Sequence, residues 1–356
     1  MRGRLVLPLA LAAALLANRA LAVRSAVRVY TARDGLPQFQ VKALCQDRGG
    51  FLWVGTRAGG LGRYDGRRFE ITDAATGLPG SSIQSLSTGP GGEILVGTLS
   101  GGAVYANGSW TTLPPTPGPS PAVNALLALP DGRLFAGAAG GLFVAPRIGA
   151  PFETVAVVGD LVGAEVLSLL ATPDGAIWAG TIRGLARLLP GGALTRVAAR
   201  DLPEKSIATL APAAGEGLLA GVAESGLYEV DVAAGTAKRV GTDTAPGREI
   251  SAVLREAEGG GTWIATRDRG AFRWDGASGF EKFGMLEGLP DQRVWALLED
   301  REGVLWLGTD SGLAKRGPAA FRTYGPEDGL PEATPLFSMA ETADGAHPVA
   351  ADNPAP

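Results

Sequence analysis

A short hydrophobic stretch recurs seven times along this chain, and its spacing limits what the chain can fold into. The first copy, residues 51–56, reads FLWVGT, and most copies end in Gly-Thr. The last residues of the seven copies are Thr56, Thr98, Ala138, Thr181, Val222, Thr266 and Thr309. Consecutive copies are therefore 42, 40, 43, 41, 44 and 43 residues apart. A near-constant period of this length predicts one structural unit used seven times and stacked into a single body.

The first repeat shows the plan of this unit. Residues 41–46, 51–56, 61–64 and 68–72 read as strands, and Asp- and Gly-rich turns separate them. Glycine suits such turns because it adopts positive φ at no steric cost. Four antiparallel strands in about 42 residues are typical of one propeller blade. We therefore predict an all-β fold, a seven-bladed β-propeller of four-stranded antiparallel blades.

The same pattern predicts which residues are buried. The first strands of the other six blades are expected at 83–87, 123–128, 166–171, 207–211, 250–255 and 294–299. The Trp, Phe or Leu of each recurring stretch is expected to pack between blades, and the glycine after it allows a neighbouring backbone to come close. Cys45 is the single cysteine and lies in a strand-like run. It is predicted to be a small buried hydrophobic residue that cannot form an intrachain disulfide.

Two similar segments compete for one place in the seventh blade. Residues 26–31 resemble residues 320–324, and both read as outer strands. We predict that residues 26–31 take this place, so that the N-terminal strand closes the ring of a propeller spanning residues 23–318. Residues 319–356 would then start an eighth repeat, with a strand from Leu336, and end in an irregular tail over 346–356. The hypothesis that follows is a truncated or frameshifted piece of a longer protein.

The first 22 residues differ from the rest. Two early arginines precede an apolar run at 5–17, and Ala20-Leu21-Ala22 forms a small-residue cleavage site. This layout predicts a cleaved signal peptide over residues 1–22 and hence a periplasmic or extracytoplasmic protein. An uncleaved anchor is the alternative, although the run is short for about 30 Å of hydrocarbon. Cleavage leaves 29 basic and 36 acidic residues, a net charge of −7, which does not favour nucleic acid as a partner.

The repeats also resemble a known family. The Asp-Gly-Leu-Pro segment at 34–37, then Gln-Asp-Arg-Gly-Gly at 46–50 and Leu-Trp-Val-Gly-Thr at 52–56 are similar to the two-component regulator propeller repeat, as are residues 294–313. The resemblance covers roughly residues 26–345 and is strongest in repeats one and seven. It implies an extracytoplasmic sensor domain of a signal-transduction protein. In that family a second propeller, a β-sandwich, a membrane helix and an output module usually follow, so membrane attachment would come from a missing downstream segment.

The sequence offers little for catalysis. The one histidine, His347, lies in the tail, so the predicted ring has no histidine base. No His, Cys or carboxylate spacing indicates a metal site, and no nucleophile elbow or Walker loop is present. We therefore predict no enzyme activity, no cofactor and no metal.

What remains is a binding surface. In a propeller, the loops that precede the first strand and those between the second and third strands lie on one face. The candidate ligand-binding residues in these loops are Arg57, Arg183, Arg248, Arg267, Arg269, Arg293, Trp295 and Asp310. Because arginine pairs well with carboxylates, our hypothesis is a small-molecule or oligosaccharide ligand that is anionic. Two alternatives stay open: solvated charge paired with Glu224, Glu249, Asp268 and Asp291, and a stand-alone periplasmic scaffold that binds a protein or polysaccharide partner.

Overall fold

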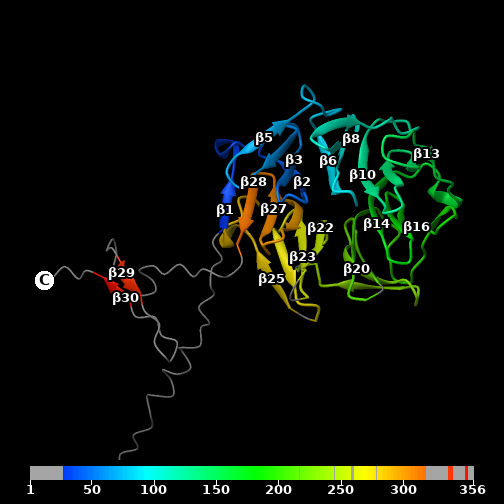
Figure 1. Cartoon of the computed structure of the whole chain (residues 1–356). Helices are drawn as coiled ribbons and strands as arrows, with labels where there is room; N and C mark the ends of the chain where they lie inside the picture. The colour runs from blue at the N-terminus through cyan, green and yellow to red at the C-terminus, as the bar shows by residue number, and fades with distance from the viewer. Residues whose placement is uncertain are drawn as a thin grey trace, which may run out of the picture. The chain divides into compact units, whose positions relative to one another are not determined.

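The computed structural model describes residues 27–215, 217–243, 245–257, 260–277 and 279–317, together with the backbone of Leu336–Met339 and Val349–Ala351. Residues 27–317 form one compact unit, the ring shown in Figure 1. It consists of seven four-stranded antiparallel sheets. The inner strand of each sheet contacts the inner strands of both neighbouring sheets, so the seven close into a ring. The prediction of an all-β, seven-bladed propeller is therefore confirmed.

In blades one to six the strands run outward in chain order, and in the seventh blade the N-terminal β1 is the outer strand. The inner strands are β2 (Val41–Gln46), β6 (Ile83–Thr88), β10 (Val123–Ala128), β14 (Val166–Ala171), β18 (Ile207–Pro212), β22 (Ile250–Arg255) and β26 (Val294–Glu299). The second strands are β3 (Leu52–Thr56), β7 (Ile94–Thr98), β11 (Leu134–Ala138), β15 (Ile177–Thr181), β19 (Leu218–Val222), β23 (Thr262–Thr266) and β27 (Leu305–Thr309). The third strands are β4 (Leu61–Tyr64), β8 (Gly101–Ala106), β12 (Gly141–Ala145), β16 (Gly184–Leu188), β20 (Gly226–Asp231), β24 (Ala271–Trp274) and β28 (Gly312–Arg316). The outer strands are β5 (Phe69–Thr72), β9 (Ser109–Thr112), β13 (Glu153–Thr154), β17 (Leu194–Arg196), β21 (Thr236–Val240), β25 (Phe280–Phe283) and β1 (Val27–Tyr30).

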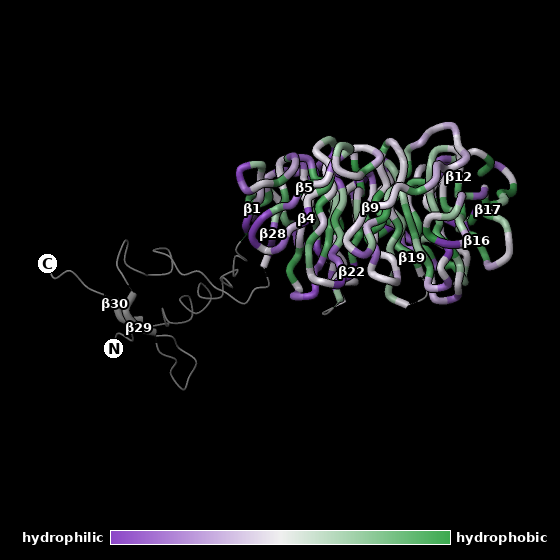
Figure 2. Tube along the Cα trace, turned by 45° about the horizontal axis from the view of Figure 1, so that its top comes forward, coloured by the Kyte–Doolittle hydropathy of each residue, from purple (hydrophilic) through white to green (hydrophobic). Residues whose placement is uncertain are grey.

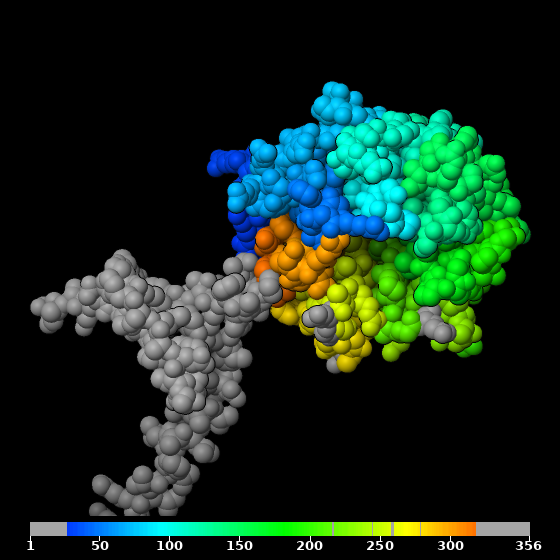
Figure 3. Space-filling model, in the orientation of Figure 1, coloured from blue at the N-terminus to red at the C-terminus, as the bar shows by residue number. Residues whose placement is uncertain are grey.

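The N-terminal strand closes the ring. Strand β1 pairs antiparallel with β28, with Val27 opposite Arg316 and Tyr30 opposite Leu313. The seventh blade therefore combines one strand from the start of the ring with three from its end, as predicted. In Figure 3 the last, orange blade accordingly lies next to the first, blue one.

The recurring stretch contains the second strand of each blade. All five residues of each second strand are buried. The predicted burial of the tryptophans in these strands is confirmed for Trp53, Trp178, Trp263 and Trp306. The glycines allow close blade packing: a Cβ on Gly55 would lie 2.5 Å from Cγ2 of Ile83 in the next blade. Figure 2 shows the hydrophobic segments running along the strands. Cys45 is also buried, as predicted.

Every inner strand carries a β-bulge at the same place. In each blade the pairing with the second strand skips the second residue of the inner strand. The seven bulge residues are Lys42, Gln84, Asn124, Leu167, Ala208, Ser251 and Trp295. All seven are partly buried, whereas the residue before each is fully buried. A bulge redirects a side chain away from the pleat, so these seven positions are set apart from the core.

The remaining described backbone is a hairpin in which β29 (Leu336–Met339) pairs antiparallel with β30 (Val349–Ala351). Strand β29 agrees with the strand predicted from Leu336, but β30 lies in the stretch 346–356, which the sequence predicts to be irregular. The predicted signal peptide, residues 1–22, lies outside the described residues. Among the described residues, no helix is long and apolar enough to span a bilayer.

Candidate functional site at one end of the ring

Three positions of each blade meet at the end of the ring where the second and third strands join. The first residue after the second strand donates its backbone N–H to the carbonyl of the residue before the inner strand. This bond is 3.0 Å from Arg57 to Gln40, 2.9 Å from Arg267 to Glu249 and 3.2 Å from Asp310 to Arg293. Blades two, four and five repeat it with Leu99, Ile182 and Ala223 as donors. The bulge residue follows two positions after the accepting residue, so this end is lined by the least regular part of each repeat.

Asp310 joins side chains from the seventh and first blades. Nε1 of Trp295 donates a hydrogen bond of 2.6 Å to Oδ1 of Asp310, and Nε2 of Gln40 donates one of 3.3 Å to the same oxygen. Nη1 of Arg293 lies 3.4 Å from Oδ2. The Asp310 side chain is only 13% exposed, and these contacts fix the orientation of the Trp295 indole.

Cations from the two neighbouring blades approach the same indole. Nζ of Lys42 lies 2.9 Å from the centroid of the Trp295 ring, and Cζ of Arg267 lies 5.2 Å from it. Such cation–π contacts are favourable, especially where the cation is partly desolvated. We call Gln40, Lys42, Arg57, Arg267, Arg293, Trp295 and Asp310 the Trp295 cluster.

The cluster holds four cations and one acid, Asp310. Within the residues that the structure describes, no ion pair involves Lys42, Arg57 or Arg267. Burial lowers the pKa of Lys42 to about 8; Asp310 opposes this shift, whereas the charges of Arg267 and Arg57 add to it. Burial therefore destabilises the charged form of Lys42, and a bound anion would stabilise that form.

Three predicted site residues are bound elsewhere. Nη1 of Arg183 donates to the carbonyl oxygens of Asp160 and, at 3.2 Å, Val162. Nη2 of Arg248 pairs with Asp243, which also pairs with Arg239. Nε of Arg269 lies 3.3 Å from Oδ2 of Asp268.

The structure therefore divides the eight candidates. Arg57, Arg267, Arg293, Trp295 and Asp310 come together in the Trp295 cluster. Arg183, Arg248 and Arg269 do not, and of the acids named in the alternative only Asp268 pairs with one of them, Arg269.

Lys42 was not predicted to be a site residue. Its signal was present, because Lys42 is the one charged residue at the second position of an inner strand. The pleat alone does not show which way that residue points, since the bulge shifts the register at that position. Among the described residues, no group of three or more His, Cys, Asp or Glu side chains could hold a metal ion.

The fold defines the class of protein, a seven-bladed β-propeller. The family model described as "Two component regulator propeller" matches residues 35–58 and 288–311, in the first and seventh blades. The chain thus carries two-component regulator propeller repeats, as its sequence predicts. No curated protein matches it significantly.

Solved structures share the fold at low identity. The extracellular domain of BT3049 from B. thetaiotaomicron, described as a hybrid two-component system, is 18% identical with a TM-score of 0.70; the match covers 91% of this chain and 46% of that one. An inactive variant of virginiamycin B lyase from Staphylococcus aureus is 13% identical, with a TM-score of 0.67 and coverage of 82% and 98%. YCF48 bound to D1 peptide is 12% identical, with a TM-score of 0.64 and coverage of 83% and 97%. The chain spans less than half the length of the sensor domain.

Proposed function

We propose that this chain is an extracytoplasmic sensor propeller that binds an anionic ligand at the Trp295 cluster. The observation that carries the proposal is that three cations of the cluster, Lys42, Arg57 and Arg267, have no ion pair among the described residues. Lys42 and Arg267 lie over one fixed indole, and the charge of Arg57 acts on Lys42. Guanidinium groups bind carboxylates in a bidentate way, and an indole face packs against a sugar ring or another apolar surface. An acidic oligosaccharide, such as a uronate oligomer, offers both features.

The likeness to an extracellular sensor domain and the repeat family support a sensing role rather than an enzymatic one. In this proposal an output module of the whole protein would report ligand binding, and a cleaved signal peptide would carry the propeller across the membrane. The lyase among the structural neighbours shows that the same fold also serves enzymes. Function here therefore rests on the site and not on the fold.

Isothermal titration calorimetry with a uronate oligosaccharide tests the proposal. We expect heat of binding with the wild type and at least about tenfold weaker binding with Arg267→Ala, because a charge-assisted hydrogen bond contributes about 1.5–3 kcal/mol. Arg183→Ala is the matched control, since that arginine lies on the same face but is bound to backbone carbonyls. Equal affinity of the wild type and Arg267→Ala, or no heat at all, would remove the proposal.

A second candidate function is capture of a protein partner. The positions equivalent to Arg57 and Arg267 hold Leu99 and Ile182 in blades two and four, and these side chains are 51% and 44% exposed. Exposed apolar residues at such positions favour a protein surface, and one structural neighbour is bound to a peptide. A protein partner predicts that Leu99→Ser with Ile182→Ser abolishes binding of that partner, while uronate binding stays absent.

A further inference from the structure

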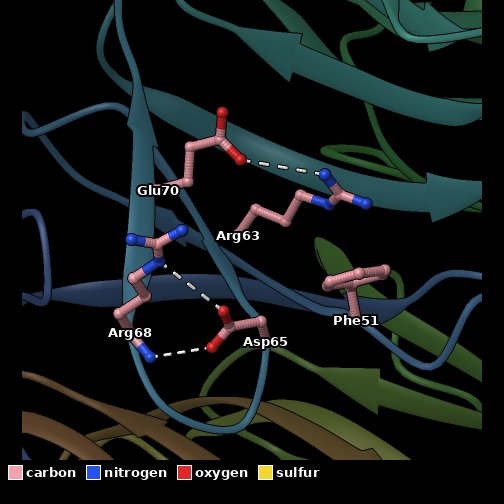
Figure 4. A pocket seen from close by; sticks show the side chains of 5 residues that line it. All are labelled: Phe51, Arg63, Asp65, Arg68 and Glu70. Atoms are coloured by element: carbon pink, nitrogen blue, oxygen red, sulfur yellow. Dashed lines mark hydrogen bonds and ion pairs between the residues drawn. The ribbon is translucent and has the colours of Figure 1, made fainter.

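A cavity of about 450 Å³ lies at the opposite end of the first blade from the Trp295 cluster. Its lining residues are Phe51, Arg63, Asp65, Arg68 and Glu70, shown in Figure 4. A neighbouring cavity of about 210 Å³ shares Phe51 and Arg63 and continues into the second blade at Tyr105 and Asn107. The two together form a groove along the seam between blades one and two.

Arg63 is the central cation of this groove. It lies on β4 between Trp53 of β3 and Glu70 of β5 in one cross-strand row. Its guanidinium carbon lies 3.8 Å from the centroid of the Phe51 ring, which fixes the plane of the group. Nη1 lies 3.7 Å from Oε2 of Glu70, a side chain that is 76% exposed. That distance is too long for a hydrogen bond.

In blades four and six, the arginine equivalent to Arg63 is paired with a carboxylate. Arg187 lies opposite Trp178 in blade four, as Arg63 lies opposite Trp53, and its Nη2 is 2.6 Å from Oδ2 of Asp174. Arg273 lies opposite Trp263 in blade six and binds Glu256 in a bidentate way, at 2.6 and 2.7 Å. In both blades, the arginine opposite the second-strand tryptophan thus holds an acid.

The turn that supplies the acid in blade four has the same backbone in blade one. Asp47 N–H donates to the Phe51 carbonyl at 3.0 Å, as Thr172 N–H donates to the Ala176 carbonyl at 3.0 Å. When Asp47 is aligned with Thr172, Gly49 corresponds to Asp174 and Phe51 corresponds to Ala176. Blade one therefore keeps the arginine but lacks an acid at the turn position that Asp174 occupies in blade four, and a cavity lies beside the arginine.

Of the three acids that line the groove, Glu70 makes only the long ion pair with Arg63, and the other two are used by their own turns. Asp47 accepts from Nε1 of Trp53 at 2.8 Å and from the Phe51 N–H at 3.0 Å. Asp65 accepts two backbone N–H groups at 2.8 Å each, and these bonds lower its pKa. Neither carboxylate is placed to pair with Arg63.

We propose that this groove is a second ligand site, in which Arg63 binds a carboxylate that comes from outside the ring. The carboxylate replaces the acid that blades four and six carry on their own turns. It belongs either to a free organic acid or to an acidic side chain of a peptide, which reaches further along the seam toward Tyr105. The site is independent of the Trp295 cluster, since it lies at the other end of the strands.

Titration of the protein with succinate and with a hexaglutamate peptide tests this site, with the Arg Nε–Hε signals in ¹⁵N NMR as readout. We expect the Arg63 signal, assigned with Arg63→Gln, to shift on titration. A double variant, Gly49→Asp with Phe51→Ala, copies the turn of blade four and should weaken binding at least about tenfold. Both changes are needed, because a Cβ on Gly49 would lie 3.2 Å from the Phe51 ring.

Controls separate the outcomes. Arg187→Gln removes an arginine that already has its acid, so binding should be unchanged, and Arg267→Ala should also leave it unchanged. Tighter binding of the peptide than of succinate identifies a peptide source, and equal binding identifies a free acid. The proposal is overturned if the Arg63 signal does not move with either probe. It is also overturned if the double variant shows a cooperative thermal unfolding transition, and is therefore folded, yet binds the probes as tightly as the wild type does.

Discussion

Nε1 of Trp295 donates a hydrogen bond of 2.6 Å to Asp310, while Nζ of Lys42 lies 2.9 Å from the centroid of the same indole. One ring thus connects an acid of its own blade with a cation of the next. Asp310 raises the pKa of Lys42, against the larger lowering effect of burial. The acid therefore both orients the indole and partly neutralises the cluster.

Removing that negative charge should strengthen anion binding. Asp310→Asn keeps an oxygen that accepts from Trp295 but leaves the cations unopposed. We expect a uronate oligosaccharide to bind about three- to tenfold more tightly, since partly solvated charges interact by about 1–4 kcal/mol at 4 Å. Calorimetry measures this, with Asp131→Asn as a control at the other end of blade three. Weaker binding by Asp310→Asn would show instead that the Asp310 carboxylate accepts a hydrogen bond from the ligand.

The lowered pKa of Lys42 predicts a pH dependence. A bound anion favours the charged ammonium, so affinity should fall as pH rises through about 8, by at most about tenfold per unit. The groups that face Lys42 are Trp295, Asp310, Arg267 and Arg57. Lys42→Met removes the ammonium that titrates near pH 8, so this variant should give a flat profile between pH 7 and 9 (about one unit on each side). A profile that is equally steep in Lys42→Met would contradict this assignment.

The titration of Lys42 should also make the free energy of unfolding depend on pH, with stability rising as pH rises. The pKa of about 8 in the folded state lies below the ordinary lysine value of 10.5, so the folded state binds fewer protons between these values. The free energy of unfolding should therefore rise with pH from about 8 to 10.5 relative to Lys42→Met. Urea unfolding of both proteins at several pH values measures the difference. Parallel curves would show that Lys42 titrates normally.

Tyr30 should account for much of the stability of ring closure. It is 2% exposed, and its ring lies 5.3 Å from that of Tyr64 and 5.7 Å from that of Trp306. Tyr30→Ala should lower the free energy of unfolding by about 3–5 kcal/mol. Tyr30→Phe loses only the bond from the Tyr64 hydroxyl at 3.2 Å and should cost about 0.5–1.5 kcal/mol. Similar losses in both variants would argue against β1 as the closing strand.

Close packing at the junction of the last and first blades predicts a further effect. A Cβ on Gly308 would lie 2.6 Å from Cγ1 of Val41, so Gly308→Ala should destabilise the ring by about 1–3 kcal/mol. Gly317→Ala is the control, because its Cβ would meet nothing within 4 Å. Denaturant unfolding compares the two. An unchanged midpoint for Gly308→Ala would mean that the seventh and first blades separate more easily than the structure shows.

Most of the ring could be predicted from the sequence. The period, the Gly-Thr ends and the turn glycines are local signals, and they place each inner strand within a residue of its position. Ring closure by β1 was also predictable, because two similar segments compete for one place. The strand at Val349–Ala351 was not, since a segment with few β-branched residues gives little signal.

The site was predictable only in part. Loop position identified Arg57 and Arg267, but whether an arginine is free depends on acids brought near by folding. Arg183 is held by Asp160 and Val162, residues of a long loop with no repeat pattern. Lys42 was missed because a bulge, which sequence periodicity does not show, redirects its side chain.

The indole signals of the protein labelled with ¹⁵N-tryptophan test the central claim most directly. The chain has seven tryptophans, and Trp295→Phe assigns the signal of the cluster. On titration with a uronate oligosaccharide, the account predicts that the Nε1–H signal of Trp295 moves, because its ring and its bond to Asp310 lie in the site. The signals of the buried Trp53, Trp178, Trp263 and Trp306 should stay in place. Binding that leaves the Trp295 signal unmoved would contradict the account.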